Sequence, residues 1–213
     1  MRILVVHAHP DPDSFNASLF RTTCRVLAEQ GGEVDALDLY AEGFQPVMDR
    51  AERGRYHDQG VNETGIEREV ERLMSADGLV FVYPTWWYGL PSMLKGWLER
   101  IWLPHRSFII PPPGSRGPIR PGMTRIRLLG GISTYGAPWL WTKWVGDPGR
   151  RTVMRGVGAL CHPRRETFWQ GHYLMDQSTP ASRATFLDQV ERRLRRLRSV
   201  QRERSASSVL PLA

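Results

Sequence analysis

Short hydrophobic runs alternate along the chain with segments in which hydrophobic residues recur every three or four positions. The runs that predict strands cover residues 3–6, 34–39, 79–83 and 126–129. A fifth strand is expected within residues 157–173. The run at 79–83 lacks polar alternation, which is typical of a strand buried on both faces. We therefore expect this strand to lie at the centre of a sheet.

Helical periodicity fills the intervals between the predicted strands. The hydrophobic helix faces are Phe15, Leu19, Thr23, Val26 and Leu27; Ile66, Val70, Leu73 and Met74; Leu94, Trp97, Leu98, Ile101 and Trp102; and Leu187, Val190, Leu194 and Leu197. Asp147 and Thr179 each precede a proline and are expected to cap helices. Strands that alternate with helices favour a parallel sheet covered on both faces. Five such strands suit an α/β three-layer sandwich of the flavodoxin-like type, with strand order 2-1-3-4-5.

Length and composition predict one domain. The chain has 213 residues, of which 41% are hydrophobic, so it can bury a full core. We expect a single flavodoxin-like domain over residues 1–200, followed by a basic, frayed tail at 201–213. Residues 40–61 and the proline-rich segment 104–123 are expected to form long irregular connections.

Neither the net charge nor the cysteines indicate a particular binding or catalytic function. The formal charge is +7, and the last 22 residues contribute seven arginines against one glutamate. Charge gathered at one helix end is typical of a solvated surface, so nucleic-acid binding is not expected. Cys24 and Cys161 fit neither a disulfide framework nor a metal site. Because no apolar stretch is long enough for a secretory signal or a membrane span, we expect a cytoplasmic protein with no integral membrane segment.

Three turns should meet at the carboxyl ends of the first, third and fourth strands, where open parallel sheets bind ligands. In the first turn Ser14 is suited to cap a helix, so the amides of Phe15 and Asn16 would point outward at the positive end of the helix dipole. This arrangement suits a phosphate, and His9 adds a donor or a positive charge. An ordinary capped helix with no ligand suits the same residues equally well. His7 and His9 lack a third ligand at matching spacing, so no metal site is expected.

The second turn carries three adjacent aromatic residues. Trp86, Trp87 and Tyr88 lie between Pro84 and Pro91, and their flat faces suit a flat ligand such as a flavin ring. Aromatic rings that only cover the end of the sheet are the alternative, which is the better interpretation for Trp86 taken alone.

The third turn is expected to begin at Gly130 and Gly131, which allow close approach of a ring. Tyr135 follows and would supply a phenol near negative charge that develops on a reduced flavin. A turn tyrosine that faces solvent suits the sequence equally well. The chain has no GxGxxG fingerprint and no Walker loop, which disfavours a Rossmann dinucleotide fold.

Two of these turns resemble those of the flavodoxin-like NAD(P)H:quinone oxidoreductases. The resemblance rests on Ala8-His9-Pro10, Ser14-Phe15-Asn16, Pro84, Trp87-Tyr88-Gly89, Pro91 and Leu94-Lys95-Gly96-Trp97, and it extends over residues 2–197. It implies that the phosphate part of a flavin is held by His9, Ser14, Phe15, Asn16 and Ser18. It also implies that the isoalloxazine is bordered by Pro84, Thr85, Trp87 and Tyr88, with Gly131 and Tyr135 closing the other side.

The resemblance further implies a homodimer with flavin sites at its interface. Hydride would pass from NAD(P)H to flavin N5, and a quinone or similar aromatic acceptor would then be reduced in the same pocket, with Tyr135 as the catalytic residue. FAD is the expected cofactor and FMN the alternative. The mammalian members carry a histidine shortly after the tyrosine of the third turn, whereas residues 138–145 of this chain contain none.

Two other functions share this fold. A flavin-binding regulatory subunit of a membrane transporter would keep the same motifs. An electron-carrier flavodoxin fits less well, because such carriers resemble acidic chains with a Thr/Gly-rich phosphate loop, and this chain is basic.

Overall fold

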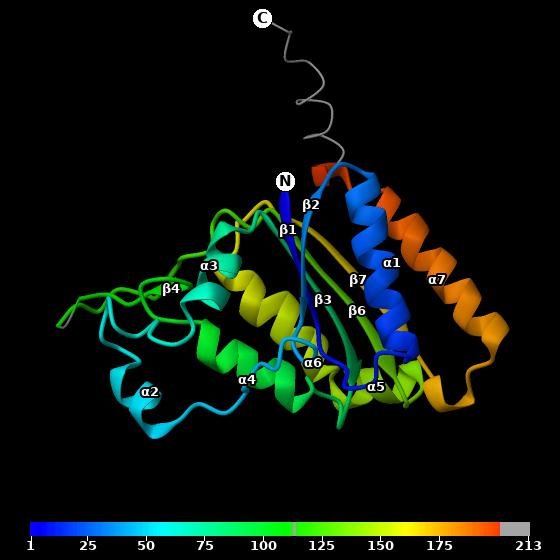
Figure 1. Cartoon of the computed structure of the whole chain (residues 1–213), viewed down its shortest axis with the longest axis horizontal. Helices are drawn as coiled ribbons and strands as arrows, with labels where there is room; N and C mark the ends of the chain where they lie inside the picture. Colours follow the sequence, from blue (N-terminus) through cyan, green and yellow to red (C-terminus); the bar gives the residue numbers. More distant parts are fainter. Residues whose placement is uncertain (113, 201–213) are drawn as a thin grey trace, which may run out of the picture.

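The computed structural model describes residues 1–112 and 114–200. Five parallel strands form its main sheet: β1 (Arg2–His7), β2 (Glu33–Asp38), β3 (Gly78–Thr85), β6 (Leu128–Tyr135) and β7 (Glu166–His172). Their order is β2-β1-β3-β6-β7, which confirms the predicted sheet with β3 at its centre (Figure 1). The predicted tail at 201–213 lies outside the described residues.

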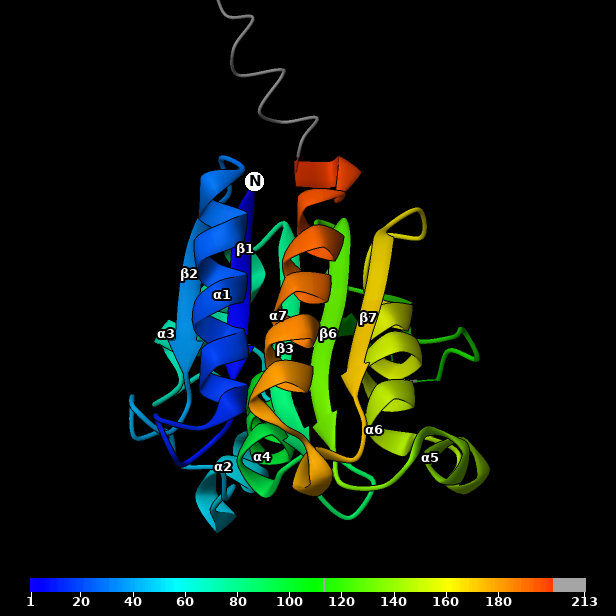
Figure 2. The same ribbon diagram turned by 90° about the vertical axis from the view of Figure 1, so that its right-hand side faces the viewer.

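Helices cover both faces of this sheet. The helices are α1 (Phe15–Glu29), α2 (Arg50–Arg55), α3 (Glu67–Ser75), α4 (Ser92–Ile101), α5 (Trp139–Val145), α6 (Pro148–Arg151) and α7 (Pro180–Arg195), with a π-helix at Thr152–Val157 and short 3₁₀ turns at Gly158–Leu160 and Met175–Gln177. Figure 2 shows α1 and α7 side by side on one face, with α3, α4 and α6 on the other. The molecule is therefore the three-layer sandwich that the sequence predicts.

Two hydrophobic cores result from the alternation of side chains along each strand. In β3, Phe81 points to the core under α3 and α4, whereas Val80 and Val82 point to the core under α1 and α7. Trp97 of α4 is fully buried in the first core, with its ring centroid 6.3 Å from that of Phe81. Because both faces of the sheet are buried, a slip of one residue would place every side chain on the wrong side.

The predicted boundary of the fourth strand is wrong. β6 runs from Leu128 to Tyr135 rather than ending at residue 129, so Gly130 and Gly131 lie inside a strand and not in a turn. A Cβ atom at Gly130 would stand 2.0 Å from the Phe168 ring, and one at Gly131 would stand 2.1 Å from the Trp169 ring. Both glycines make room for aromatic side chains of β7, and neither borders a ligand pocket.

One of the two predicted helix caps is confirmed, and both predicted irregular segments contain short elements. Thr179 caps α7 through a capping box with Ser182, as expected. Asp147 does precede a helix, but its side chain makes no capping hydrogen bond and its backbone is left-handed, with φ of 50°. Segment 40–61 contains α2, and segment 104–123 contains a small antiparallel pair, β4 (Phe108–Ile109) with β5 (Arg120–Pro121).

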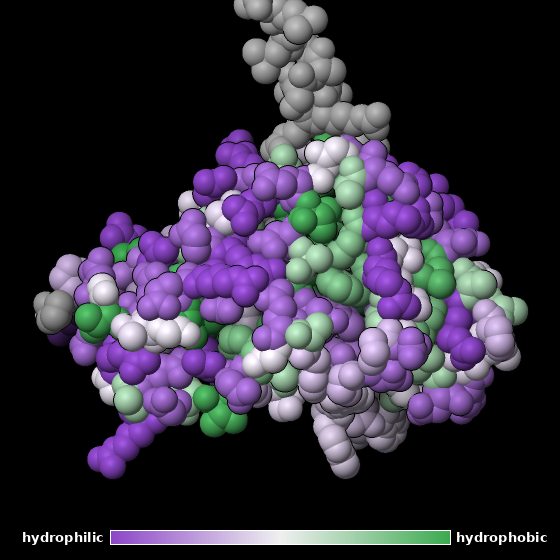
Figure 3. All heavy atoms as spheres, in the orientation of Figure 1, coloured by the Kyte–Doolittle hydropathy of each residue, from purple (hydrophilic) through white to green (hydrophobic). Residues whose placement is uncertain are grey.

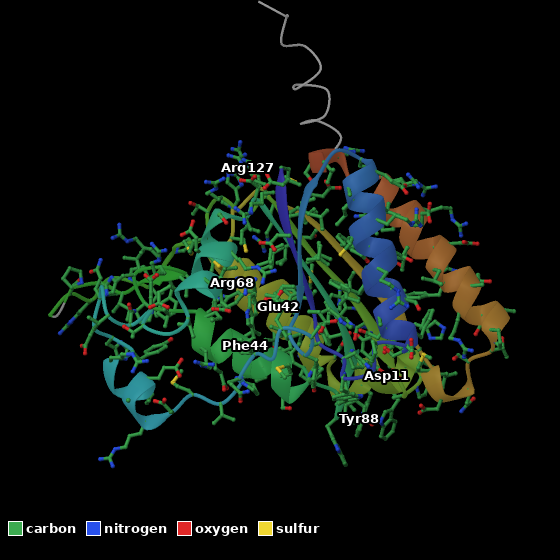
Figure 4. All side chains as sticks on the ribbon, viewed as in Figure 1. Asp11, Glu42, Phe44, Arg68, Tyr88 and Arg127 are labelled. Atoms are coloured by element: carbon green, nitrogen blue, oxygen red, sulfur yellow. The ribbon has the colours of Figure 1, made fainter. Side chains whose placement is uncertain are left out.

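Ion pairs cover the β2 edge of the sheet. Arg72 of α3 is buried, and its guanidinium lies 2.7 Å from Asp35 and 2.9 Å from Glu42. Arg68 forms a further ion pair with Glu42 at 3.4 Å, and Figure 4 shows both side chains over the same part of the surface. Figure 3 shows that hydrophilic side chains cover most of this face. Charges at a sheet edge discourage pairing with strands of other molecules.

Two arginines of α7 contact other parts of the protein, whereas a solvated helix end would leave them in solvent. Arg195 pairs with Glu29 of α1 at 2.6 Å and with Glu191 at 2.7 Å. The Arg193 guanidinium lies over the Phe168 ring, 5.5 Å from its centroid. These contacts hold α7 against α1 and the sheet. No helix within residues 1–112 and 114–200 is long and apolar enough to cross a membrane.

Substitution of Gly130 by alanine tests its packing role. The added methyl group would overlap the Phe168 ring, so we expect a loss of about 1–3 kcal/mol in the free energy of unfolding. Chemical denaturation measures this loss. The control is Gly54→Ala in α2, where nothing lies within 4 Å of the new Cβ atom; this change should leave stability unchanged or raise it by up to about 1 kcal/mol. Equal effects of the two substitutions would contradict the assignment.

Candidate functional site

A cavity of about 610 Å³ opens at the carboxyl ends of the central strands. It is lined by His9, Pro84, Thr85, Trp86, Trp87, Tyr88, Thr134, Tyr135, Gly136, Ala137, Thr142, Met175 and Asp176. These residues come from the carboxyl ends of β3 and β6, from the turns after β1, β3 and β6, from α5 and from the short turn at Met175–Gln177. Figure 4 shows Asp11 and Tyr88 at this edge of the molecule. The cavity therefore occupies the place where open parallel sheets bind ligands.

The first turn ends in a capped helix whose first amides are free. The Ser14 hydroxyl accepts a hydrogen bond from the amide of Ala17 at 3.1 Å, which confirms Ser14 as the cap of α1. The amides of Phe15 and Asn16 have no intrahelical acceptor, as at any helix start. His9 is held over this turn because its Nδ1 accepts a hydrogen bond from the Asp11 amide at 3.0 Å.

The side chains of this turn differ in where they point. The Phe15 ring packs away from the cavity, 5.4 Å from His172 and 6.3 Å from Phe186, so only its backbone can reach a ligand there. The Ser18 hydroxyl bonds within the helix to the Ser14 carbonyl at 3.4 Å. The Asn16 side chain is buried, and neither its nitrogen nor its oxygen has a hydrogen-bond partner among the described residues.

His7 directly precedes the first turn and packs against α1. It is fully buried at the end of β1, its Nδ1 lies 2.9 Å from Asp38, and its ring stacks on Phe20 with 4.7 Å between centroids. Burial lowers the pKa of His7, while the Asp38 carboxylate and the Asn16 side chain act in the opposite direction and His9 adds to the lowering. The imidazole is thus neutral at pH 7.

The second turn is rigid and strained. Trp87 and Tyr88 have φ angles of 48° and 61°, in the left-handed region that non-glycine residues avoid. The turn is closed by a hydrogen bond from the Gly89 amide to the Trp86 carbonyl at 3.0 Å. Trp87 is 95% exposed, whereas the Trp86 ring lies 5.9 Å from His9. A large flat side chain held in solvent by a strained backbone is a feature to be explained by binding rather than by folding.

Two contacts from α5 and α6 fix the second turn against the rest of the site. The Trp141 indole donates a hydrogen bond to the Tyr88 hydroxyl at 2.7 Å. The amide of Gly149 donates to the Tyr88 carbonyl at 3.2 Å, and a Cβ atom at Gly149 would approach the Gly89 backbone to 3.3 Å. Gly149 therefore allows α6 to pack directly against the aromatic turn.

Tyr135 forms part of the cavity wall, but its hydroxyl is already engaged. It donates a hydrogen bond to Asp147 Oδ1 at 3.2 Å and accepts one from the Trp169 indole at 3.1 Å. Burial, followed by the nearby Asp147 carboxylate, raises the pKa of Tyr135. The Tyr173 ring stacks on that of Tyr135 with 4.6 Å between centroids, and burial raises the pKa of Tyr173 to about 12. The hydroxyl hydrogen of Tyr135 is thus directed at Asp147 and not at the cavity.

The structure brings most of the predicted site residues to one cavity. Those that line it are His9, Pro84, Thr85, Trp86, Trp87, Tyr88 and Tyr135. The predicted residues that do not line it are Ser14, Phe15, Asn16, Ser18, Gly130 and Gly131. The third wall consists instead of the end of β6, at Thr134 and Tyr135, and of Gly136 and Ala137 in the turn that follows. The small residues Gly136 and Ala137 directly after the tyrosine were the signal for this turn. Met175 and Asp176 gave no signal, because they reach the cavity from a distant part of the chain.

Residues 1–149 match a family model described as having a flavodoxin-like fold. The chain is 30% identical over 158 residues to the ribosyldihydronicotinamide dehydrogenase [quinone] of Pongo abelii, with 67% of each protein covered. The chain belongs to the flavodoxin-like family of NAD(P)H:quinone oxidoreductases.

Other relatives and solved structures agree with this family fold. The chain is 32% identical to the mouse ribosyldihydronicotinamide dehydrogenase [quinone] over 52% of its own length, and it spans about half (54%) of that relative. It superimposes on the NAD(P)H:quinone oxidoreductase of Methanothermobacter marburgensis with a TM-score of 0.74 and 24% identity, covering 92% of this chain and 96% of the other. An FMN-dependent NADH-azoreductase from Bacillus anthracis, solved with FMN, gives a TM-score of 0.70 at 18% identity, covering 92% and 98%. The two structures show the shared fold.

His7 should make stability depend on pH. Its pKa is lowered in the folded protein, so the unfolded chain takes up a proton first as pH falls. The stabilisation is therefore complete above the unfolded pKa of about 6.5 and is lost below it, at up to about 1.4 kcal/mol per pH unit. Chemical denaturation between pH 8 and pH 5 should show that the free energy of unfolding falls less for His7→Gln than for the wild type. The exposed His57→Gln serves as control, and identical pH profiles of the His7 variant and the wild type would refute this role.

Proposed function

We propose that the chain is a flavin-dependent oxidoreductase that takes hydride from NAD(P)H and delivers two electrons to a quinone or similar aromatic acceptor. The observation that carries the proposal is a cavity lined both by His9 of the first turn and by the strained aromatic turn. The first turn leads into the start of α1, whose free amides suit a phosphate, and the aromatic turn suits a flat ring. The names of the family relatives support the same reaction, although the chain spans only about half of the first relatives' length.

The amino-terminal end of α1 fits the phosphate of a flavin. The free amides of Phe15 and Asn16, the positive end of the helix dipole and the His9 imidazole all favour an anion at this position. The Asn16 side chain is buried, acts on the neighbouring His7 imidazole and makes no hydrogen bond within normal distance among the described residues, and His7 Nε2 is likewise unpartnered. A ligand or water that satisfies Asn16 would offset the cost of burying it. In this proposal Ser14 and Ser18 hold the turn, and His9 and Asn16 contact the ligand.

The aromatic turn fits the ring of a flavin. Pro84, Thr85, Trp87 and Tyr88 form one wall, Trp86 lies between this wall and the phosphate end, and Thr134 to Ala137 form the opposite wall. In this proposal the backbone amides and the hydroxyls of Thr85 and Thr134 are the candidate donors for the pyrimidine edge. When bound, a flavin supplies the hydride acceptor and the two-electron chemistry. The protein orients the ring and excludes water from one of its faces.

The flavin in this proposal is FAD, because the first turn resembles that of family members that use FAD. FMN is the alternative, and the azoreductase solved with FMN is the relevant precedent for the fold. Binding of each flavin to the same apoprotein distinguishes them.

A homodimer with the flavin sites at its interface completes the proposal. The exposed residues around the cavity are large and hydrophobic: Trp87, Trp139, Leu140, Trp141 and Trp144. Exposed apolar surface of this kind is uncommon on a monomer and typical of an interface. A second copy placed here would cover the open side of the cavity and the exposed face of Trp87.

An anaerobic titration tests the function. We expect the purified protein to bind flavin. The flavin absorption band at about 450 nm should bleach when NADPH is added and return when a benzoquinone is added. Return of the band establishes both half-reactions. Flavin that binds but is not reduced by NADPH or NADH would favour the regulatory-subunit alternative, and no binding of FAD or FMN would exclude the proposed enzyme.

Replacement of Tyr135 by phenylalanine tests the proposed catalytic residue. The change leaves the Asp147 carboxylate and the Trp169 indole without their shared partner, which alters the charge behind the cavity wall. We expect flavin content to stay the same and turnover to fall about tenfold, equivalent to about 1.4 kcal/mol in the barrier. Tyr173→Phe, which keeps the stacked ring, is the control. Unchanged turnover of Tyr135→Phe would remove Tyr135 from the mechanism.

A further inference from the structure

A second, smaller cavity lies beside the first. Its volume is about 200 Å³, and its charged lining residues are Lys143, Asp147, Arg150, Arg151 and Arg155. Four positive charges against one negative charge give this cavity a net charge of +3. It is formed by the end of α5, by α6 and by the π-helix that continues α6. Figure 2 shows α5 and α6 next to each other at the carboxyl end of the sheet.

Three of the four positive charges of this cavity have no carboxylate partner among the described residues. Asp147 is buried, and its two carboxylate oxygens already bind Lys143 and the Tyr135 hydroxyl. Arg150, Arg151 and Arg155 have no ion pair or side-chain hydrogen bond with any residue in 1–112 or 114–200. Elsewhere, Arg72 and Arg195 have carboxylate partners. The three guanidinium groups of this cavity thus differ from the paired arginines elsewhere in the molecule.

The local backbone also keeps these charges together. Arg151 and Arg155 are four residues apart, a spacing at which like charges on a helix repel by a few tenths of a kcal/mol, about 0.2–0.5. Gly146 has a φ angle of 98°, and a Cβ atom there would stand 3.4 Å from Arg151 Nη1, so the glycine leaves room for the guanidinium. The segment after α6 is a π-helix, a rare form that is frequent at functional sites. Repulsion that the fold does not relieve suggests an anionic ligand.

The two cavities share a wall. Tyr135 lines the first and Asp147 lines the second, and these side chains are joined by the 3.2 Å hydrogen bond. Thr142 and Lys143, adjacent on α5, likewise face one cavity each. A long ligand whose ring lies in the first cavity can therefore place an anionic group in the second.

The geometry points to a phosphate subsite: the basic cavity binds a phosphate group of the nicotinamide dinucleotide whose nicotinamide enters the first cavity. Arginine is suited to this task because its planar fork pairs with two phosphate oxygens at once. The phosphate is either the 2′-phosphate that distinguishes NADPH from NADH or the diphosphate common to both. This inference rests on the proposed function for the identity of the dinucleotide.

Isothermal titration calorimetry with two fragments tests the subsite without any turnover. Adenosine 2′,5′-bisphosphate carries the 2′-phosphate, and ADP carries the diphosphate alone. Each is titrated into the full-length wild type, the double variant Arg151→Gln/Arg155→Gln and the control Arg164→Gln, whose arginine lines a different cavity with Arg127 and Glu166. Circular dichroism and thermal unfolding confirm that the variants fold, which is expected because the replaced side chains are exposed.

We expect the double variant to bind at least one fragment about tenfold more weakly or worse, as loss of a charged hydrogen bond implies, and the control to bind within about twofold of the wild type. Weaker binding of the bisphosphate alone assigns the 2′-phosphate, and the ratio of kcat/KM for NADPH to that for NADH should then fall. Weaker binding of both fragments assigns the diphosphate. Undiminished binding by the double variant, or no binding by the wild type, overturns the subsite. Flavin reduction that persists in either of those cases leaves the proposed function standing without it.

Discussion

The in-register parallel pairing of β3 with β1 and β6 is the constraint on which the site depends. Val82 pairs with His7 on one side and with Ile132 on the other, and Thr85 pairs with Tyr135. The Thr85 and Ser133 hydroxyls add a 2.8 Å hydrogen bond at the end of this pairing. Because the three strands run parallel, the turns that follow them lie at the same edge of the sheet, although β3 and β6 extend beyond the end of β1. Burial of both faces prevents a slip in register, so the position of the cavity follows from the sheet rather than from the turns themselves.

Backbone strain is concentrated where these turns meet. Among the described residues, the non-glycine positions with positive φ are Trp87, Tyr88, His105, Asp147 and Leu174. All but His105 belong to the cavity walls or adjoin them. Each left-handed residue costs about 1–2 kcal/mol, and hydrogen bonds between the second turn, α5 and α6 offset this cost. The left-handed backbone places Trp87 in solvent and Asp147 behind Tyr135. The proposed site depends on the first of these features and the basic cavity on the second.

The sequence was sufficient for much of the fold and less so for the site. Uninterrupted hydrophobic runs such as 79–83 identified the strands because a buried parallel strand has no polar alternation. Ser14 and Thr179 were predictable as caps because capping involves only neighbouring residues. Gly130 and Gly131 were misread, since a pair of glycines suggests a turn and the rings that fill the space above them come from β7 in a distant segment. The engagement of Tyr135 by Asp147 and Trp169 could not be predicted for the same reason, and neither could the approach of Met175 to the cavity.

A crystal structure of the protein with bound flavin is the most direct test of the proposed site. We expect the flavin phosphate to lie on the amides of Phe15 and Asn16, and the ring to lie between Trp87 and the segment from Thr134 to Ala137. In that structure the Asn16 side chain should gain a hydrogen-bond partner, either the ligand or an ordered water. A flavin found at the opposite end of the sheet, in the cavity that Arg127 and Arg164 line, would contradict the account.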